Sequence, residues 1–343
     1  MSAPSIRAGI VGYGYMGEIR RSVIERHPRL HLAGVCDTSL DVRKNIPGVA
    51  VFDSCDRLLS ENIDALFVCT PNIHSPEICI GALNAGKHVF CEKPPGRNVE
   101  DIRSIQRAET PGAVLMFGFN HRLHPAMMKA KVIADSGRLG KILGMRGIYG
   151  KSGGVNFRQS WRNDKGIAGG GILLDQGIHM LDLFRYFCGD FEFVKCFVDH
   201  SFWKFDVEDN AYVILQNKRG QSATMHSSST LWKHTFRLDI IMEDGYLIID
   251  GLLSKTGSYG RQKLVVGRRQ FEDESSALGN PAEEVTTFDK DQSWDLEVDE
   301  FVKCIDTNSP VTLSSSEDAL KVMEIIEKAY QDAGVESMAV DIQ

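Results

Sequence analysis

The sequence predicts an α/β protein in which a doubly wound parallel sheet is followed by an α+β part, with a mostly antiparallel open sheet and helices on one face. Three observations support this fold class. Through the first 120 residues, short apolar runs alternate with helix-compatible segments, as in parallel sheets. A glycine-rich turn joins the first run to the first helix. Beyond residue 126, strand-like runs follow one another without regular helices, which is typical of antiparallel sheets.

The chain of 343 residues is long enough for about two domains, which we place at residues 1–122 and 123–343. In the second domain we expect strands at 193–198, 209–216, 222–227, 236–242 and 246–249. We expect an acidic, linker-like segment at 280–291, and then two amphipathic helices at 294–306 and 316–333.

The composition argues against several classes of protein. Hydrophobic residues make up 43% and charged residues 25% of the chain, as in ordinary globular proteins. The formal net charge is -7 and the basic residues are scattered, so we expect no nucleic-acid partner. We find neither a long apolar run nor a signal-like N-terminus, so we expect a cytoplasmic protein without membrane contact. The eight cysteines form no C-x-x-C pair, so we expect buried thiols and no metal site.

The glycine-rich turn predicts a Rossmann dinucleotide-binding fold. A strand-like run over residues 6–11 leads into it, and a helix-compatible segment follows to about Arg26. The first glycine permits a tight turn, the second lets a pyrophosphate approach the backbone, and the third lets helix and strand pack closely. We expect the whole turn to bind the cofactor, namely Gly12, Tyr13, Gly14, Tyr15, Met16 and Gly17.

Asp37 predicts which dinucleotide is bound. It ends the strand-like run 31–36, twenty residues after Gly17, where a carboxylate accepts hydrogen bonds from the adenosine ribose. A carboxylate there repels a 2′-phosphate, so we expect NAD rather than NADP, although Arg43 is close enough in sequence to neutralise a phosphate. Asp37 is alternatively the N-cap of a helix over 40–45.

Further polar residues follow two other predicted parallel strands. Thr70, Pro71 and Asn72 come after the run 65–69, and His74 precedes a helix. Glu92 and Lys93 end the run 89–91 before two prolines, and Lys93-Pro94 is a candidate cis bond that would aim the lysine. Because ligands bind beyond the carboxyl ends of parallel strands, we expect these side chains at the cofactor.

The second half carries a candidate catalytic helix. Asp175, His179 and Asp182 are spaced i, i+4 and i+7 within an apolar segment that follows three glycines, so a regular helix places them on one face. A buried carboxylate and imidazole must be satisfied by each other or by a ligand. The preceding loop, 150–171, is either a plain surface lid or a binding element for a hydroxylated or anionic ligand. It carries Arg158, Trp161, Arg162 and Lys165.

These motifs resemble one known family, the glucose-fructose oxidoreductase, inositol dehydrogenase and rhizopine-catabolism (Gfo/Idh/MocA) family. The resemblance rests on the glycine turn, Asp37, Thr70-Pro71-Asn72, His74, Glu92-Lys93-Pro94, Asn120-x-Arg122 and the Asp-x-x-x-His after the glycines. It implies that Lys93, Asp175 and His179 are the catalytic set. It also implies that the C-terminal helices pack back on the first domain, and that the sheet joins subunits into a homodimer or homotetramer.

We therefore predict an NAD-dependent oxidoreductase that interconverts a secondary alcohol and a ketone on a sugar or cyclitol. His179 is the predicted base, Asp175 orients it, and Lys93 holds the reacting oxygen. The residues predicted to bind the substrate are Lys93, Arg122, Trp161, Arg162, Asp175 and His179.

Two alternatives remain open at this stage. Arg122, Arg158 and Arg162 suit a nucleotide-linked or phosphorylated sugar, because guanidinium groups bind phosphate well. A protein of another class, an NAD-binding regulator without turnover, shares the cofactor motifs. The presence of Lys93, Asp175 and His179 together argues against that regulator.

Overall fold

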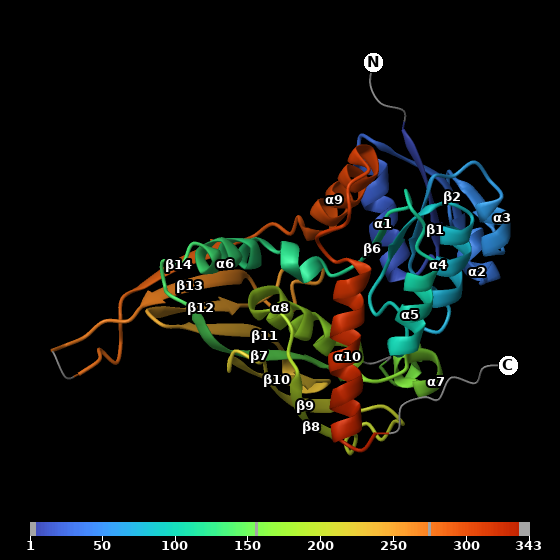
Figure 1. Cartoon of the computed structure of the whole chain (residues 1–343). Coiled ribbons are helices and arrows are strands. Elements are labelled where there is room, and N and C mark those ends of the chain that lie inside the picture. The colour runs from blue at the N-terminus through green and yellow to red at the C-terminus, as the bar shows by residue number, and fades with distance from the viewer. Residues whose placement is uncertain (1–4, 155–156, 274–275, 336–343) are drawn as a thin grey trace.

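The computed structural model describes residues 5–154, 157–273 and 276–335, which form two sheets with helices packed around them (Figure 1). The first sheet has six parallel strands in the order β3-β2-β1-β4-β5-β6. Its strands are β1 (Ile6–Val11), β2 (Leu30–Cys36), β3 (Ala50–Phe52), β4 (Ala65–Val68), β5 (His88–Cys91) and β6 (Leu115–Phe117). The predicted doubly wound parallel sheet is confirmed.

Helices connect these strands and cover the sheet. They are α1 (Tyr15–Arg26), α2 (Leu40–Lys44), α3 (Cys55–Leu59), α4 (Ser75–Asn84) and α5 (Val99–Arg107). The chain reverses its direction of winding between β1 and β4, which are neighbours in the sheet. In sheets of this kind, that position opens a crevice at the carboxyl ends of the strands.

Among the described residues, the second sheet has eight strands in the order β14-β13-β12-β11-β7-β10-β9-β8, of which only β7 and β10 pair in parallel. Its strands are β7 (Ile142–Ser152), β8 (Phe193–Asp199), β9 (Asn210–Gln216), β10 (Ser222–Ser228), β11 (Thr230–Met242), β12 (Gly245–Asp250), β13 (Gln262–Arg268) and β14 (Glu283–Phe288). The predicted mostly antiparallel sheet is confirmed.

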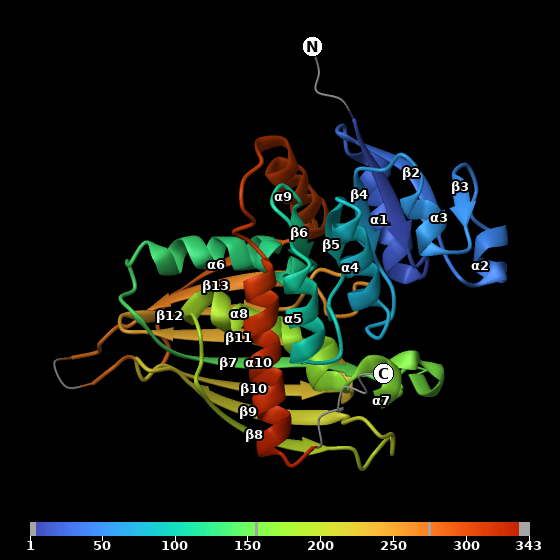
Figure 2. The same ribbon diagram turned by 45° about the vertical axis from the view of Figure 1, so that its right-hand side comes forward.

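Three helices lie along one face of this sheet: α6 (Pro125–Asp135), α8 (Ile178–Cys188) and α10 (Ser316–Asp332) (Figure 2). Because the helices cover only one face, buried and exposed side chains alternate along β9. Ala211 and Val213 are buried, whereas Tyr212 and Ile214 are exposed. Side chains on a strand point to opposite faces in turn, so this sheet has one packed face and one open face.

The expected linker at 280–291 is wrong, because it contains the edge strand β14, which pairs with β13. Its side chains are mostly exposed, and two of them, Glu283 and Glu284, are acidic. Edge strands often carry exposed charges, so their composition resembles that of a linker. The backbone pairing with β13, which composition does not reveal, makes the segment a strand.

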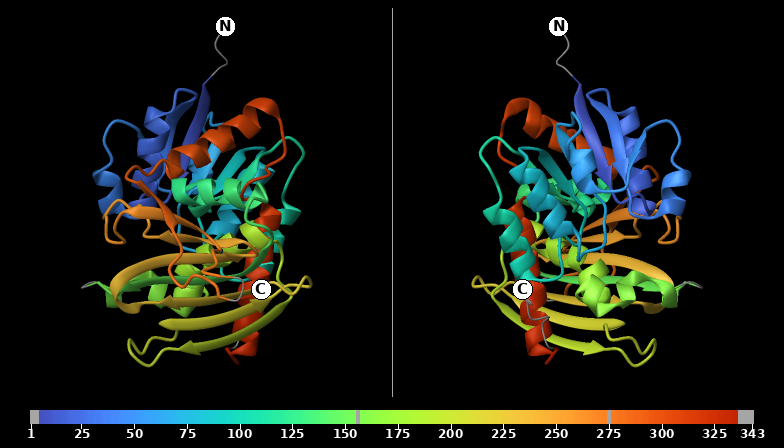
Figure 3. Two further views of the ribbon diagram at one scale, coloured as in Figure 1. Left: turned by 90° about the vertical axis from the view of Figure 1, so that its left-hand side faces the viewer. Right: turned by 90° about the vertical axis from the view of Figure 1, so that its right-hand side faces the viewer.

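Helix α9 (Ser293–Thr307) returns to the first sheet, as Figure 3 shows. Phe301 packs edge-on against Phe67 and Phe90 of that sheet. Beside them, the buried guanidinium of Arg20 in α1 binds Glu297 of α9 at 2.7 Å. The end of the chain therefore completes the core beneath the N-terminal sheet.

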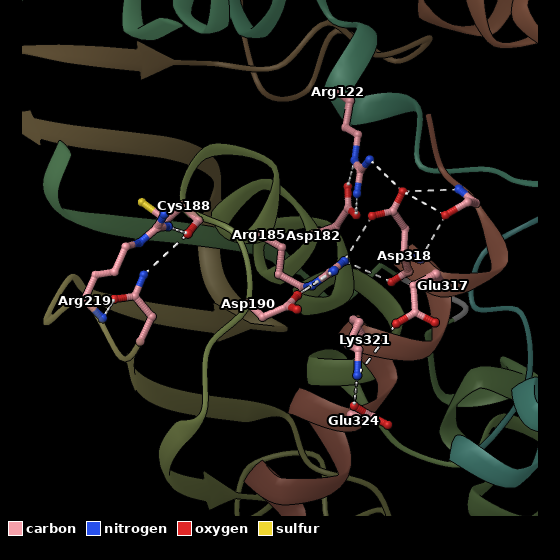
Figure 4. Close-up of polar contacts among 12 residues, drawn as sticks. Arg122, Asp182, Arg185, Cys188, Asp190, Arg219, Glu317, Asp318, Lys321 and Glu324 are labelled. Atoms are coloured by element: carbon pink, nitrogen blue, oxygen red, sulfur yellow. Dashed lines mark hydrogen bonds and ion pairs between the residues drawn. The ribbon is translucent and has the colours of Figure 1, made fainter. Parts of the chain in front are cut away.

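A short 3-10 helix, η1 (Asn120–Leu123), connects the two sheets and ties the first one to α8. The Arg122 guanidinium donates to both carboxylate oxygens of Asp182 in α8, at 2.8 and 2.6 Å. It also contacts Asp318 of α10 at 3.1 Å, and Arg185 of α8 reaches the same carboxylate (Figure 4). Arg122 and Asp182 are both buried. Three segments distant in sequence are therefore held together by one charge cluster.

Within the described ranges, no helix is both long and apolar enough to cross a membrane.

Candidate active site

A cavity of about 630 Å³ opens at the carboxyl ends of the parallel strands. Most of the predicted cofactor residues line it, as do three of the residues predicted to bind the substrate, Lys93, Trp161 and Arg162. They are Gly12, Gly14, Tyr15, Met16, Asp37, Thr70, Pro71, Asn72, His74, Glu92, Lys93, Trp161 and Arg162. The predicted Tyr13 and Gly17 are not among the lining residues. The strand ends and the loop after β7 thus meet around one space.

The glycine turn has the geometry that a dinucleotide requires. Gly12 has a φ of 87°, which favours glycine, and a Cβ on Gly17 would lie 2.3 Å from the Gly12 carbonyl oxygen. A Cβ on Gly14 would meet nothing within 4 Å. Gly12 and Gly17 are therefore needed for chain packing, whereas Gly14 faces open space beside the N-terminus of α1. This space suits a pyrophosphate.

Asp37 presents its carboxylate to the same cavity. Its oxygens accept hydrogen bonds from the backbone N–H groups of Tyr13 and Ser39, both at 2.8 Å. The N-cap of α2 is Ser39, so the alternative reading of Asp37 as that cap is wrong. The Arg43 guanidinium donates to the carbonyl oxygens of Asp37 and Thr38 and so supports the loop.

The two charged residues that follow β5, Glu92 and Lys93, bind different partners. The Glu92 carboxylate, at the cavity, binds the buried Arg20 of α1 at 2.6 Å. Burial raises the pKa of Glu297, the other partner of Arg20, to about 8. Lys93 instead extends toward Asp175, whose backbone oxygen accepts from its ammonium at 2.6 Å. The Lys93-Pro94 bond is cis.

Asp175 gathers three cations. Its carboxylate lies 3.0 Å from the Lys151 ammonium, 3.2 Å from Nε of Arg162 and 3.5 Å from the Lys93 ammonium. Burial alone would raise the pKa of Asp175, but Lys151, Lys93 and Arg162 outweigh it and hold this pKa well below its usual range. Burial lowers the pKa of Lys93, and Asp175 only partly opposes that shift.

The expected contact between Asp175 and the His179 ring is absent from the described structure, in which no hydrogen bond to this imidazole is found. The physical reason is local. Asp175 lies in a π-helical turn, Leu173–Gly177, that precedes α8. A π turn is wider than an α turn, so residues four apart no longer share a face. The carboxylate therefore points to the cations.

His179 is instead held by another ring. The imidazole of His121 in η1 stacks on it with centroids 3.7 Å apart and an interplanar angle of 17°. His121 is itself fixed, because its nitrogens contact Asn120 Oδ1 at 3.0 Å and the Tyr149 hydroxyl at 3.2 Å. Burial and the nearby Lys93 charge lower the pKa of His179 well below its usual range. His179 is therefore neutral near pH 7.

Sequence reasoning missed three residues here: His121, Tyr149 and Lys151. His121 follows directly on β6 and its turn, where functional residues gather, but its stacking on a residue 58 positions away leaves no local signal. Tyr149 and Lys151 lie near the end of β7. The sequence signal that could have identified Lys151 is its position as a cation at the end of a strand.

Two predicted arginines do not reach the cavity. The structure corrects the expectation that Arg122 binds substrate, because its guanidinium forms ion pairs with the buried Asp182 and with Asp318. Arg158 lies over the rings of Trp203 and Phe205, and its own side chain is exposed. Among the predicted arginines, Arg162 therefore remains at the site. It also lies over the Trp161 ring, 4.5 Å from its centroid.

Comparisons with known proteins agree with this architecture. Residues 6–119 match the family description "Oxidoreductase family, NAD-binding Rossmann fold", and residues 127–248 match "GFO/IDH/MocA C-terminal domain". D-glucoside 3-dehydrogenase of Escherichia coli is 31% identical over 257 residues, which are 70% of this chain and 73% of that protein.

Levoglucosan dehydrogenase of Pseudarthrobacter phenanthrenivorans is 33% identical over 211 residues, or 56% of this chain, and the match spans about half (53%) of that relative's length. The solved structure of a levoglucosan dehydrogenase in complex with NADH superposes with a TM-score of 0.84. At 21% identity, it covers 97% of this chain and 98% of that one, and so supports the fold.

We predict that the His179 ring titrates well below pH 6.5, the usual pKa of an imidazole, because burial and the Lys93 charge disfavour its protonated form. Histidine ring signals followed by NMR across pH 4–8 test this, with His179→Gln used to assign the signal. A His179 signal that titrates at or above pH 6.5 would contradict the electrostatics described here.

Proposed function

Because this chain belongs to the Gfo/Idh/MocA family of oxidoreductases, we propose that it is an NAD-dependent dehydrogenase of a secondary alcohol on a sugar or cyclitol. The observation that supports the proposal is the pairing of Lys93 with His179. Lys93 lines the cofactor cavity, whereas the buried His179 is not among the lining residues but is close enough for the Lys93 charge to lower the pKa of its ring. We infer that this cation and this neutral base act together on a substrate that enters beside the nicotinamide end of the cofactor.

The residues divide the binding of the cofactor among them. The turn at Gly12 and Gly14 would receive the pyrophosphate, and Asp37 the adenosine ribose. Thr70, Asn72 and Glu92 line the same cavity as Lys93. When bound, the nicotinamide supplies the redox chemistry by accepting or returning a hydride.

The chain's own groups handle the proton. As the carbinol becomes a carbonyl, its hydroxyl proton must pass to a base, and the neutral His179 ring is available for it. The Lys93 ammonium would donate a hydrogen bond to the same oxygen and stabilise the charge that develops there. Asp175 would hold Lys93 in place through its backbone oxygen and carboxylate.

His121 would replace Asp175 as the group that orients the base. Its ring covers one face of His179 and is locked by Asn120 and Tyr149. A fixed neutral ring can hold the imidazole plane without competing for its nitrogens. Nδ1 of His179 accordingly has no hydrogen-bond partner among the described residues.

We predict that His179→Ala and Lys93→Met each lower kcat by roughly 10²–10⁴-fold, the usual contribution of a positioned acid–base group. The assay follows NADH absorbance over a panel of polyols, cyclitols and aldoses. His31→Ala and Lys44→Met, at exposed positions, are the matched controls. Near-normal turnover in either site variant, with unchanged NADH affinity, would remove that residue's role.

A panel without any turnover, despite tight binding of NADH, would favour a regulatory protein over a dehydrogenase.

We also propose that NAD is preferred over NADP, because the Asp37 carboxylate lines the cavity while Arg43 is engaged with backbone carbonyls. We predict that NADH binds at least about tenfold more tightly than NADPH, and that Asp37→Ala narrows this ratio. Titration by NADH fluorescence measures both constants. Equal affinity of the unmodified protein for the two cofactors would refute the proposal.

Subunit association through the C-terminal sheet is a further part of the proposal. The face of the sheet opposite the helices leaves Phe193, Phe197, Tyr212 and Ile214 about half exposed or more. An apolar patch of this kind on adjoining strands marks an interaction surface. We propose that a second copy of the chain covers it.

We predict that sedimentation velocity finds a dimer or tetramer, and that Ile214→Glu shifts it toward smaller species, because a charge on this patch would be buried in the interface. Val132→Glu, on the exposed side of α6, is the control and should leave the assembly intact. A monomeric wild-type protein would exclude this interface.

A further inference from the structure

The cluster around Asp175 carries more positive charge than it neutralises. Lys93, Lys151 and Arg162 are three cations, and Asp175 is their one ion-pair partner among the described residues, which leaves an excess of two positive charges. The side chains of Lys93 and Lys151 are only 19% and 20% exposed, so water screens their two ammonium charges poorly, whereas the Arg162 side chain is 42% exposed.

Among the described residues, the neighbouring acids Glu92, Glu208 and Asp209 form no ion pair with these three cations, because other groups hold their carboxylates. Glu92 binds Arg20. Glu208 accepts from the backbone N–H groups of Gly171 and Leu173 and from the Tyr330 hydroxyl. Asp209 accepts from the backbone N–H groups of the 202–203 turn. Lys151 and Arg162 can therefore form a further ion pair with an anionic group from outside the chain.

Hydrogen-bond donors remain for such a group. Each of Lys151 and Arg162 gives one hydrogen bond to Asp175, and within the described ranges neither has another acceptor. An ammonium has three N–H groups and a guanidinium five. The Arg162 guanidinium, held over the Trp161 ring, thus keeps donors that suit a carboxylate or phosphate.

The position of Lys151 indicates that it binds a group other than the cofactor. Arg162 borders both the cofactor cavity and a small cavity of about 20 Å³ behind Asp175, whereas Lys151 borders only the small cavity. Phe157 and Phe205 form apolar walls there. A volume of about one water molecule extends the site by a small group and not by a nucleotide.

We propose that the substrate is an acidic sugar or polyol, with a carboxylate close to the carbinol that is oxidised, and that Lys151 and Arg162 bind this carboxylate. This inference rests on the proposed function and narrows its substrate class. Lys151 determines specificity, because it adds charge at the substrate side without lining the cofactor cavity.

Matched pairs of substrates test the proposal. Aldonic or uronic acids are compared with the corresponding alditols or aldoses, and kcat/KM with NAD is measured for each. The wild-type protein should prefer the acid by at least about tenfold, the effect of a charge-assisted hydrogen bond in a poorly hydrated site. Equal or better turnover of the neutral partners would overturn the inference while leaving the dehydrogenase assignment intact.

Two variants localise the effect. Lys151→Gln should lower the acid-to-neutral ratio by about tenfold or more, and Lys151→Arg should largely retain it, because the charge is kept. Lys141→Gln, which removes an exposed charge just before the same strand begins, should not change the ratio. An unchanged ratio in Lys151→Gln would refute the role of this lysine.

Binding distinguishes failure of the inference from failure of the proposed function. If neither class of substrate is oxidised, the same acids and neutral compounds are titrated into the protein–NADH complex and followed by NADH fluorescence. Acid-selective binding that Lys151→Gln abolishes would support the anion site without the dehydrogenase. Lack of acid-selective binding would overturn the anion site as well.

Discussion

The buried ion pair between Arg122 and Asp182 is the constraint on which the site depends. It joins the turn after the last parallel strand to α8, the helix that carries His179 three residues before Asp182. The residue preceding Arg122 is His121, which stacks on His179. One short turn thus fixes both the position of the helix and the plane of its imidazole.

The Arg122–Asp182 pair fixes the position of α8 more than it adds to the net stability of the fold. Removing charges from water costs several kcal/mol per ion, and only good geometry with further hydrogen bonds offsets this cost. Arg122 has that geometry, with two bonds to Asp182 and a third contact to Asp318. Breaking it would leave a buried charge unpaired and release α8 from the first sheet. In the intact structure, Asp175 lies in the wider turn before α8 and forms ion pairs with Lys93, Lys151 and Arg162.

The fold and the cofactor cavity were largely predictable, because both follow from local patterns. Glycine spacing, Asp37 and the strand end at Lys93 needed only the rule that parallel strands end at one edge. The contacts around α8 were not predictable. Arg122 pairs with residues 60 and 196 positions away, and a π turn redirects Asp175 from His179 to Lys151. Periodicity assumes a regular helix, so it missed this change.

The most direct test of the account is a crystal structure of the protein with NAD and a substrate that it oxidises slowly. The account predicts that one substrate hydroxyl oxygen lies within hydrogen-bond distance of both the His179 ring and the Lys93 ammonium, with its carbon facing the nicotinamide. A reacting hydroxyl bound elsewhere, with His179 and Lys93 on opposite sides of the cavity, would contradict it.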